Sequence, residues 1–284
     1  LSALLPRLAR DERIELHLVL HTSQRRLFDL DGLAVTLHEA RFSDGFLARL
    51  IWEQLCLPWL AWRVANLTYS PANFGPLLAP RPVVLLRNAL GVSGHERRLS
   101  KRVYWWVLGA MTWLSLLRAP MALAVSNYAR RELSFGFERK VRVVHHGIEC
   151  LRFHPSPEPR GDFILAVGDI TIQKNYATLI KAMSLLEGSQ LRIAGKRVDE
   201  AHARDLETLI HRLNLGDRVT LMGPQTPEAL ALLYRQCRIF AFSSTVETFG
   251  NPLVEAMASG CAIVCSKAAA MPEILEEAGV YAEA

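Results

Sequence analysis

The sequence of 284 residues has few of the features that assign a protein to a class at once. No uncharged apolar run reaches the length of about 20 residues that a membrane-spanning helix needs. No Cys-x-x-Cys pair is present, and no group of His, Cys and acidic residues has the spacing of metal ligands, so we expect no metal site. The 17 Gly and 14 Pro are too few for a collagen-like chain, and apolar residues, at 50%, are too abundant for a disordered one.

The five cysteines are odd in number, and most lie in apolar or strand-like surroundings. They indicate buried thiols in a reducing compartment, so we expect a cytoplasmic protein. The chain begins at Leu1 inside an apolar helical pattern and ends at Ala284 just after an apolar run. We interpret it as a fragment that lacks both ends, and the lack of a targeting segment therefore carries no weight.

The net charge of +5 is mild. It suits an anionic substrate or an anionic membrane surface. The basic residues are scattered and no platform of aromatic and basic residues repeats, so we do not expect a nucleic-acid partner.

In the second half of the chain, short apolar runs rich in β-formers alternate with amphipathic helical patterns such as 176–186 and 203–213. Continuous apolar strands separated by helices predict a parallel sheet that is covered on both faces. The five expected strands are Phe163–Gly168, Leu191–Gly195, Val219–Gly223, Ile239–Ser243 and Ala262–Ser266.

Ligands of such sheets bind beyond the carboxyl ends of the strands, so the residues that follow each run are site candidates. They are 169–174, 196–197, 224–225, 244–250 and Lys267.

The first half shows the same alternation less clearly, with helices expected over 44–64, 94–117 and 127–135. Its expected strands are Ile14–Leu20, Ala34–His38, Leu67–Ser70, Val83–Leu86, Met121–Val125 and Val141–His145. The length suits two domains, and the Pro-rich stretch 153–161 is a stiff spacer unsuited to a helix or a central strand. We therefore predict an N-terminal domain over 1–152, a linker over 153–161 and a C-terminal domain over 162–284, with one sheet in each domain.

The most specific pattern runs from Glu247 to Glu255, directly after an expected strand. Gly250 allows a close backbone approach, and Pro252 suits the first turn of a helix. The free N–H groups and the positive dipole end of that helix would make a phosphate site. Two carboxylates beside it suggest acceptors for the hydroxyl groups of a sugar and a ribose. The alternative is structural, with Glu247 capping the turn and Glu255 solvated in the first turn.

The stretch Glu-Thr-Phe-Gly-Asn-Pro-Leu-Val-Glu followed by Ala-Met-Ala-Ser-Gly resembles the signature of retaining GT-B glycosyltransferases of family 4. The hinge segment at 143–155, the Val-Ser pair at 125–126, the segment 166–175 and the turn Met271–Ile274 resemble further motifs of that family. The resemblance covers 120–284 well and implies an α/β fold in which two Rossmann-like domains face each other across a cleft.

The resemblance also implies roles for individual residues. Lys174 would neutralise the diphosphate leaving group, and Glu247 would bind hydroxyls of the transferred sugar. Backbone N–H groups at 249–251 would meet the sugar and the phosphate, Glu255 would bind the ribose, and no cofactor or metal ion would be needed. The donor-binding residues so implied are Gly168, Phe249, Gly250, Asn251 and Glu255.

The sequence departs from the family pattern at two places. Asp169 stands where the family usually has an Arg, and a carboxylate facing a diphosphate would repel it. Asp169 then points away, or another cation substitutes for the Arg, or the activity is lost or altered. The candidates for a substituting cation are Arg87, Lys196 and Arg197.

On the acceptor side, Arg87 and Asn88 follow a buried strand at the position where the family has a His. They are the acceptor-side candidates, and His95 in the next loop is a weaker one.

Residues 103–117 are uncharged and apolar all round, and basic residues flank them at both ends. Three Trp and one Tyr beside basic residues suit a membrane interface, so we expect peripheral contact through 97–118 on the inner face of the plasma membrane. A Trp-rich stretch over 52–62 suits the same surface. The alternative is a helix buried against the sheet.

Taken together, the sequence predicts a retaining glycosyltransferase that moves a hexose from a nucleotide-sugar donor to a saccharide or lipid-linked acceptor in surface polysaccharide or glycoconjugate synthesis. The main alternative is a non-catalytic nucleotide-sugar-binding protein whose leaving-group clamp is degraded at Asp169. A GT-B epimerase or phosphorylase is a further alternative.

Overall fold

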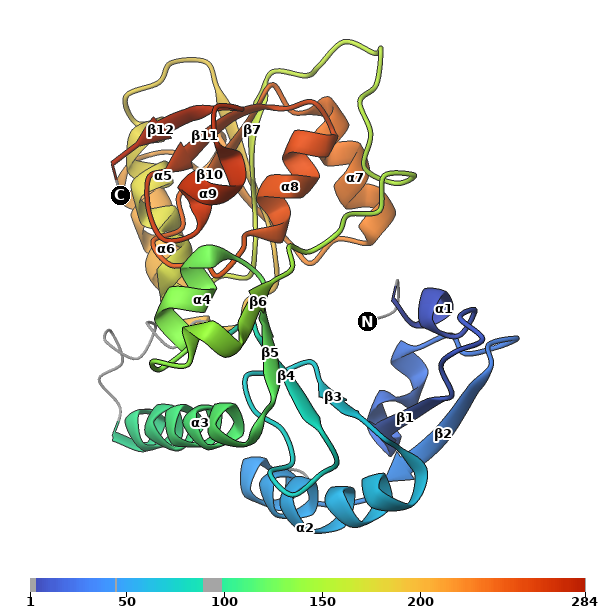
Figure 1. Ribbon diagram of the computed structural model, residues 1–284. Coiled ribbons are helices and arrows are strands. Elements are labelled where there is room, and N and C mark those ends of the chain that lie inside the picture. Colours follow the sequence, from blue (N-terminus) through green and yellow to red (C-terminus); the bar gives the residue numbers. More distant parts are fainter. Residues whose placement is uncertain (1–3, 44, 89–98, 284) are drawn as a thin grey trace. The chain divides into compact units, whose positions relative to one another are not determined.

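The computed structural model describes residues 4–43, 45–88 and 99–283, with the backbone alone for 99–102 (Figure 1). The candidate His95 and the basic residues Arg97 and Arg98 lie outside the described residues. The chain divides into two compact units. The first comprises Leu1–Leu86, Trp106–Leu123 and Arg139–Val141, and the second comprises Arg87–Trp105, Ala124–Glu138 and Arg142–Ala284.

The second unit is built on a six-stranded sheet of order β12-β11-β10-β7-β8-β9. Each pair of neighbouring strands is parallel, as expected of apolar runs separated by helices. All five predicted strands are confirmed within one residue at each end, and β12 was not predicted. The strands are β7 (Phe163–Val167), β8 (Gln190–Ala194), β9 (Val219–Gly223), β10 (Ile239–Phe242), β11 (Ala262–Ser266) and β12 (Val280–Ala282).

Helices cover both faces of this sheet, and each face has its own apolar core (Figure 1). Along β7, Phe163, Leu165 and Val167 pack in one core, while Ala166 belongs to the other core, as the alternation of side chains along a strand requires. On the first face lie α7 (Pro227–Gln236), α8 (Asn251–Ala258) and α9 (Met271–Leu275); on the second lie α5 (Tyr176–Met183) and α6 (Glu200–Arg212).

Side-chain caps mark where two of these helices begin. The Asp199 side chain accepts a hydrogen bond from the N–H of His202 at 3.1 Å and caps α6. The Thr226 side chain does the same for Ala229 in α7, where Pro227 occupies the first turn. Both arrangements satisfy N–H groups that have no partner within the helix.

The strands of the first half of the chain form two further sheets. The strands β1 (Leu16–His21) and β2 (Val35–Ala40) form a parallel pair. A second sheet has the order β3-β4-β5-β6, so the described residues form three sheets, and the expectation of one sheet in each half is wrong. The remaining elements are α1 (Leu5–Leu8), η1 (Thr22–Leu27), α2 (Phe46–Val64), β3 (Thr68–Ser70), β4 (Pro82–Leu86), α3 (Leu99–Arg118), β5 (Met121–Ala124), α4 (Asn127–Leu133), η3 (Glu138–Lys140) and β6 (Val141–Val143).

The helix α3 is buried along one side and exposed along another. Leu108, Thr112, Ser115 and Leu116 are buried along one side, while Trp106 on another side is 75% exposed. In the described part of the chain, no helix is long and apolar enough to cross a membrane.

The expected burial of the cysteines is only partly correct. All five are free, and Cys237, Cys261 and Cys265 are buried, but Cys56 and Cys150 are exposed.

The Pro-rich stretch 153–161 lies within the second unit and is anchored to it at both ends. Phe153 packs in the core against Tyr234, with the ring centroids 5.8 Å apart. At the other end, the Gly161 N–H donates to the carbonyl oxygen of Gln236 in α7 at 2.7 Å, and β7 begins two residues later, followed by η4 (Ile172–Lys174) and α5. The stretch is therefore a strap across the second unit, and a domain boundary at 153–161 stays a prediction.

Arg160 joins the ends of two helices across this strap. Its Nη1 donates to the carbonyl oxygens of Tyr234 and Cys237, each at 2.9 Å, at the end of α7. Its Nη2 donates to the carbonyl oxygens of Ser259 and Gly260, each at 2.8 Å, just beyond α8. A cation is favoured where the last carbonyls of a helix lack partners, and here one guanidinium serves two helices.

We expect Arg160→Met to destabilise the second unit because four carbonyl oxygens would lose a charged donor. A loss of about 2–3 kcal/mol should lower the melting temperature by about 4–12 °C in calorimetry. Arg238→Met is the matched control, since Arg238 forms an exposed ion pair with Asp162 at 2.8 Å. Exposed pairs contribute little, so equal shifts for the two variants would contradict the capping role.

Candidate functional site

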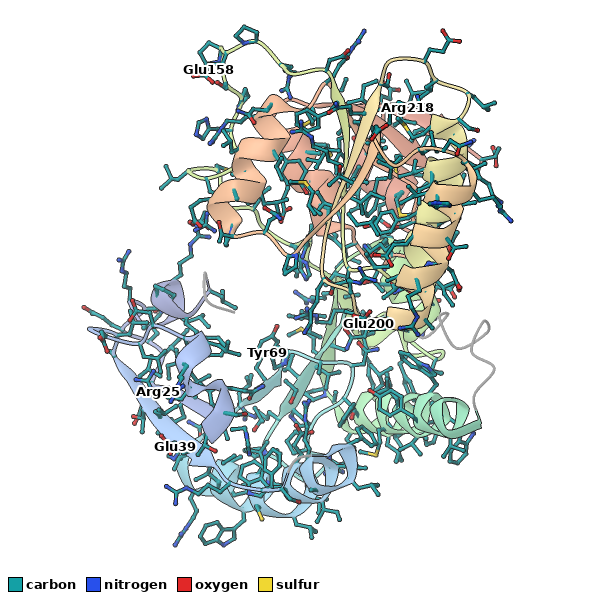
Figure 2. The ribbon with its side chains drawn as sticks, turned by 180° about the vertical axis from the view of Figure 1, so that it is seen from behind. Arg25, Glu39, Tyr69, Glu158, Glu200 and Arg218 are labelled. Atoms are coloured by element: carbon teal, nitrogen blue, oxygen red, sulfur yellow. The ribbon has the colours of Figure 1, made fainter. Side chains whose placement is uncertain are left out.

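The six-stranded sheet reverses its strand order at one point. From β7 the chain proceeds to β8 and β9 on one side, whereas β10 pairs with the other side of β7 and leads on to β11. The chain therefore leaves β7 and β10 in opposite directions along the sheet. Open α/β sheets bind ligands at such a reversal of strand order. In Figure 2, Glu200 marks the carboxyl edge of this sheet, while Glu158 and Arg218 mark the opposite edge.

Hydrogen bonds join the loop that follows β7 to the loop that follows β10. The Ser243 hydroxyl donates to the carbonyl oxygen of Lys174 at 2.7 Å, and the Thr245 N–H donates to the carbonyl oxygen of Gln173 at 2.8 Å. The turn η4 after β7 is thus fixed to the loop after β10. These bonds place the side chains of the two loops side by side.

Lys174 and Glu247 meet between these loops. Lys174 Nζ lies 2.5 Å from Glu247 Oε1, and only 13% and 19% of the two side chains are exposed. The Lys174 ammonium also lies 5.1 Å from the centre of the Phe242 ring. The sequence predicted both residues at this edge, but it gave no sign that they form an ion pair with each other.

Two glycines make room for this arrangement. Gly168 has a φ of +146°, and a Cβ there would lie 2.7 Å from Lys174 Cε. A Cβ on Gly195 would lie 1.9 Å from the carbonyl oxygen of Gly168, so β7 and β8 end in close backbone contact. Gly168 was predicted to touch the donor, and the structure shows that it provides the space that Lys174 occupies. The Tyr176 hydroxyl donates to the Gly168 carbonyl oxygen at 2.7 Å.

The helix α8 begins beside the ion pair. Gly250 precedes it with a φ of +87°, and Pro252 lies in its first turn, as predicted. Within the described residues, the N–H groups of Phe249, Gly250 and Asn251 have no hydrogen-bond acceptor. Free donors and the positive end of a helix dipole favour an anion at this position.

Glu255 lies one turn into α8 and is half-buried. Its Oε2 accepts a hydrogen bond from the hydroxyl of Tyr234, a fully buried residue in the last turn of α7, at 2.9 Å. Burial raises the pKa of Glu255, and the bond from Tyr234 offsets part of this rise. No motif in the sequence indicated Tyr234.

Asp169 is exposed, and it serves the backbone of the neighbouring loop. Its Oδ1 accepts the N–H of Lys196 at 3.1 Å, at the end of β8. Among the three cations that were candidates to replace an Arg at this position, Arg197 is committed to Glu207 at 2.6 Å and Glu200 at 3.4 Å.

The other two candidate cations are exposed. Arg87 follows β4, and its carbonyl oxygen accepts the hydroxyl of Thr248, which lies in the loop after β10. The structure thus brings Arg87 to the loop that precedes α8. Asn88, the second acceptor-side candidate, is also exposed.

A cluster missed by the sequence analysis connects α4 to α9. Glu273 Oε1 accepts the N–H of Asn127 at 2.7 Å, and its Oε2 accepts the N–H of Tyr128 at 2.9 Å. His145 Nε2 lies 3.2 Å from the same carboxylate. Burial alone would raise the pKa of Glu273, but these hydrogen bonds lower it below its usual value. Glu273 belongs to a segment that resembles a family motif, which was the one available signal.

The histidine pair that follows β6 contacts the start of α8. His146 Nδ1 lies 2.8 Å from Asn251 Oδ1. The rings of His145 and His146 lie with their centroids 5.7 and 4.9 Å from that of Phe249, which is buried. Phe249 therefore acts as a packing residue through its ring, whereas its backbone faces the start of the helix.

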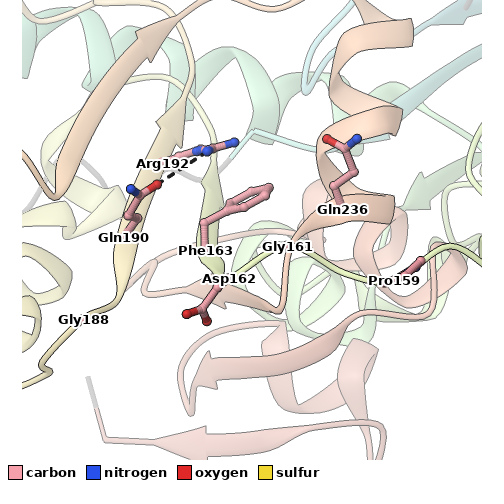
Figure 3. Close-up of a pocket in the computed structure, with 8 residues that line it drawn as sticks. All are labelled: Pro159, Gly161, Asp162, Phe163, Gly188, Gln190, Arg192 and Gln236. Carbon is pink, nitrogen blue, oxygen red and sulfur yellow. Dashed lines mark hydrogen bonds between the residues drawn. The ribbon is translucent and has the colours of Figure 1, made fainter.

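A hollow of about 510 Å³ lies at the opposite edge of the sheet (Figure 3). It is lined by the amino ends of β7 and β8, including Phe163 and Gln190, and the Arg192 guanidinium stacks 4.0 Å from the Phe163 ring centre. This edge is away from the carboxyl ends of the strands, where ligands of such sheets bind. None of the predicted site residues lines this hollow.

Over the residues that the structure describes, no group of three or more His, Cys, Asp or Glu side chains could hold a metal ion. The site at the carboxyl edge brings together the Lys174 ammonium, three carboxylates and the free N–H groups of a helix start, and the exposed Lys196 follows the neighbouring strand β8.

Comparisons with known proteins agree with this geometry. The chain is 31% identical over 188 residues to an uncharacterized glycosyltransferase of Methanocaldococcus jannaschii, covering 59% of this chain and 47% of that protein. It is 38% identical over 105 residues, 37% of this chain and 27% of the relative, to the N-acetylgalactosamine-N,N'-diacetylbacillosaminyl-diphospho-undecaprenol 4-alpha-N-acetylgalactosaminyltransferase of Campylobacter jejuni. The chain thus spans less than half of the length of either relative.

Among solved structures, HepE of Anabaena in complex with UDP superimposes with a TM-score of 0.75 at 19% identity, covering 99% of this chain and 82% of that one. This likeness shows the fold, which is the GT-B fold. Residues 150–281, which contain the six-stranded sheet except the last residue of β12, match the family described as glycosyl transferases group 1. The family match over these residues and the fold of the chain together support a group 1 glycosyltransferase.

Proposed function

We propose that this protein is a retaining glycosyltransferase that transfers a hexose from a nucleotide-sugar donor to an acceptor. The observation that carries the proposal is the meeting of Lys174 and Glu247 at the strand-order reversal, beside the free N–H groups at the start of α8. A cation and a row of backbone donors match the diphosphate of such a ligand, and the carboxylates of Glu247 and Glu255 match the hydroxyl groups of its sugar and its ribose.

In this proposal the donor lies along the first turn of α8. Glu255 accepts the ribose hydroxyls, and the N–H groups of 249–251 bind the sugar and the phosphate. A carboxylate suits a ribose because the two neighbouring hydroxyls can donate to its oxygens. The half-buried carboxylate also makes the site selective for ligands with these hydroxyl groups. A ligand that lacks them would leave the carboxylate without a hydrogen-bond donor.

Lys174 stabilises the leaving group. An ammonium carries three N–H donors, so Lys174 can keep its bond to Glu247 and still bind the diphosphate. Negative charge grows on the diphosphate as the glycosidic bond breaks, and a fixed cation there lowers the barrier. Glu247 accepts a sugar hydroxyl at its remaining oxygen. The same-face course of the reaction, with the leaving phosphate accepting the acceptor's proton, follows the family by resemblance.

The second candidate function is a non-catalytic nucleotide-sugar-binding protein. Two observations favour it: Asp169 places an exposed carboxylate at the end of β7, and the charge of Lys174 is already paired with Glu247. Two observations oppose it: Asp169 binds the N–H of Lys196, and the neighbouring loops carry the exposed residues Arg87 and Lys196.

The acceptor is a saccharide or a lipid-linked saccharide. The Campylobacter jejuni relative is named for a diphospho-undecaprenol acceptor, and this supports a lipid-linked acceptor for the present chain. Arg87 and Asn88 are our acceptor-side residues, since the Arg87 carbonyl oxygen contacts the loop that carries Glu247. Such an activity would serve the synthesis of surface polysaccharide or glycoconjugate.

Nucleotide binding tests the donor site first. We expect one of UDP, GDP, ADP and dTDP to stabilise the wild-type protein by about 2.7 kcal/mol at 100 times its dissociation constant, measured as a thermal shift. Glu255→Gln should weaken the binding of that nucleotide about 10- to 100-fold, because a charged acceptor of the ribose is lost.

Glu187→Gln is the matched control, since Glu187 is exposed and lies after α5. The affinity of Glu187→Gln for the same nucleotide should equal that of the wild type. A folded wild-type protein that binds none of the four nucleotides or their sugar conjugates would overturn the donor site.

Turnover separates the enzyme from the binding protein. We expect Lys174→Met to lower the rate constant of sugar transfer or donor hydrolysis about 10²- to 10³-fold, because a charge that stabilises the leaving group is removed. Lys181→Met, on an exposed position of α5, should leave the rate unchanged. Saturable nucleotide-sugar binding without any transfer or hydrolysis would establish the non-catalytic alternative instead.

Peripheral membrane contact through 97–118 is the second part of the proposal, on the inner face of the plasma membrane. The exposed residues of α3 that support it include Val103, Trp106 and Leu117. The helix α2 supports it as well, since Leu47, Ile51, Leu55 and Trp59 recur every four residues and are exposed. Aromatic and aliphatic side chains beside basic residues suit an anionic lipid surface.

Sedimentation with phosphatidylglycerol vesicles tests this contact. We expect Trp106→Ser to lower the vesicle partition coefficient about tenfold, since one large apolar side chain no longer enters the interface. Leu185→Ser, at a residue of the second unit that is 85% exposed, should have no effect. A wild-type protein that stays in the supernatant at low salt would refute the contact.

A further inference from the structure

Tyr234 combines a deeply apolar environment with one polar contact. It lies in the last turn of α7 with no exposed surface, and its ring packs against Phe153 and Phe240, with centroids 5.8 and 5.4 Å away. A buried hydroxyl without a partner would destabilise the folded protein. The hydroxyl donates to Glu255 Oε2 at 2.9 Å, so this single bond decides whether the residue is tolerated there.

Glu255 uses its two oxygens differently. Oε2 accepts the Tyr234 bond, whereas Oε1 has no hydrogen-bond partner in the described part of the chain. Among the described residues, Oε1 is not one of the fully buried side-chain atoms that lack a partner, so it retains some exposed surface. The carboxylate therefore has one oxygen turned to the core and one open to a ligand.

We propose that Tyr234 is a positioning residue of the donor site, which fixes one oxygen of Glu255 so that the other is presented to the ligand's hydroxyl groups. The proposal rests on the proposed function, since it takes Glu255 as the ribose-binding carboxylate. Figure 1 shows α7 and α8 side by side on one face of the sheet, and the bond ties the end of α7 to the middle of α8.

The main chain of Tyr234 is itself fixed. Its carbonyl oxygen accepts Arg160 Nη1 at 2.9 Å and lies 3.1 Å from Cys261 Sγ. The strap over 153–161 therefore fixes the end of α7, and the end of α7 fixes the ring. This chain of contacts leaves the hydroxyl little freedom to leave Glu255.

Within the described residues, few ionisable groups affect the titration of Tyr234 and Glu255. Burial first, then Glu255, Cys261 and Cys237, raise the pKa of Tyr234 far above its usual value, so the hydroxyl remains a donor. For Glu255, burial favours the neutral acid and the Tyr234 bond favours the carboxylate. Arg160 Nη1 lies 3.8 Å from Cys261 Sγ and 2.9 Å from the carbonyl oxygen of Tyr234. Removing the hydroxyl should therefore move the titration of Glu255 to higher pH.

Tyr234→Phe tests the proposal, because it deletes the hydroxyl and keeps the ring. We expect the dissociation constant and the KM of the nucleotide-sugar donor to rise about 5- to 10-fold near neutral pH, with kcat within twofold of wild type. The acidic limb of donor affinity against pH should move upward. Tyr281→Phe is the matched control, since its hydroxyl donates to the Glu276 carbonyl oxygen at 2.7 Å, and it should change neither quantity.

A double-mutant cycle with Glu255→Gln completes the experiment. If Tyr234 acts through Glu255, Tyr234→Phe should have no effect on donor affinity in the Glu255→Gln background. The positioning role would be overturned if Tyr234→Phe had a lower melting temperature but kept the wild-type affinity for the donor and the wild-type dependence of that affinity on pH. The proposed function fails separately, when the wild type binds no nucleotide or when Glu255→Gln binds as well as wild type.

Discussion

The reversal of strand order between β7 and β10 is the constraint on which the rest of the site depends. Because the chain leaves β7 toward β8 and leaves β10 toward β11, the two loops cannot cover each other's strand ends. They meet instead along their flanks, where Ser243 and Thr245 bond to the turn after β7. Lys174 from one loop and Glu247 from the other are placed together by this topology, and α8 begins at the same edge.

Charge at this edge is arranged so that an anion can still be bound. Three carboxylates lie at this edge, and each already accepts a hydrogen bond. Glu247 accepts one from Lys174, Asp169 from the N–H of Lys196, and Glu255 from Tyr234. The backbone donors at the start of α8 have no competing acceptor among the described residues. An incoming diphosphate therefore meets free donors, while the nearest negative charges are already paired with donors of their own.

The sequence was sufficient for features that depend on local pattern. Apolar runs predicted the strands of the second unit, and position after a strand predicted the edge on which Lys174 and Glu247 lie. It was insufficient for pairing between distant side chains, because spacing along the chain carries no information on which loop faces which. The bond between Tyr234 and Glu255, the ion pair of Lys174 and the carboxylate of Glu273 at the start of α4 are all of this kind. The separation of β1 and β2 from the other strands was missed because strand length and composition do not encode sheet membership.

The Pro-rich strap shows why composition alone gave an incomplete account of 153–161. Proline excludes a helix there and stiffens the segment, which is what the sequence indicated. Stiffness has a further consequence once both ends are anchored, since Phe153 is embedded in the core and Arg160 bonds to the ends of α7 and α8. The one guanidinium of Arg160 binds both helix ends and so sets the distance between them, while the stiff segment fixes the position of Arg160. The helices α7 and α8, which carry Tyr234 and Glu255, are thereby fixed relative to each other. Phe153 and Arg160 thus help to determine the geometry of the proposed donor site without being part of it.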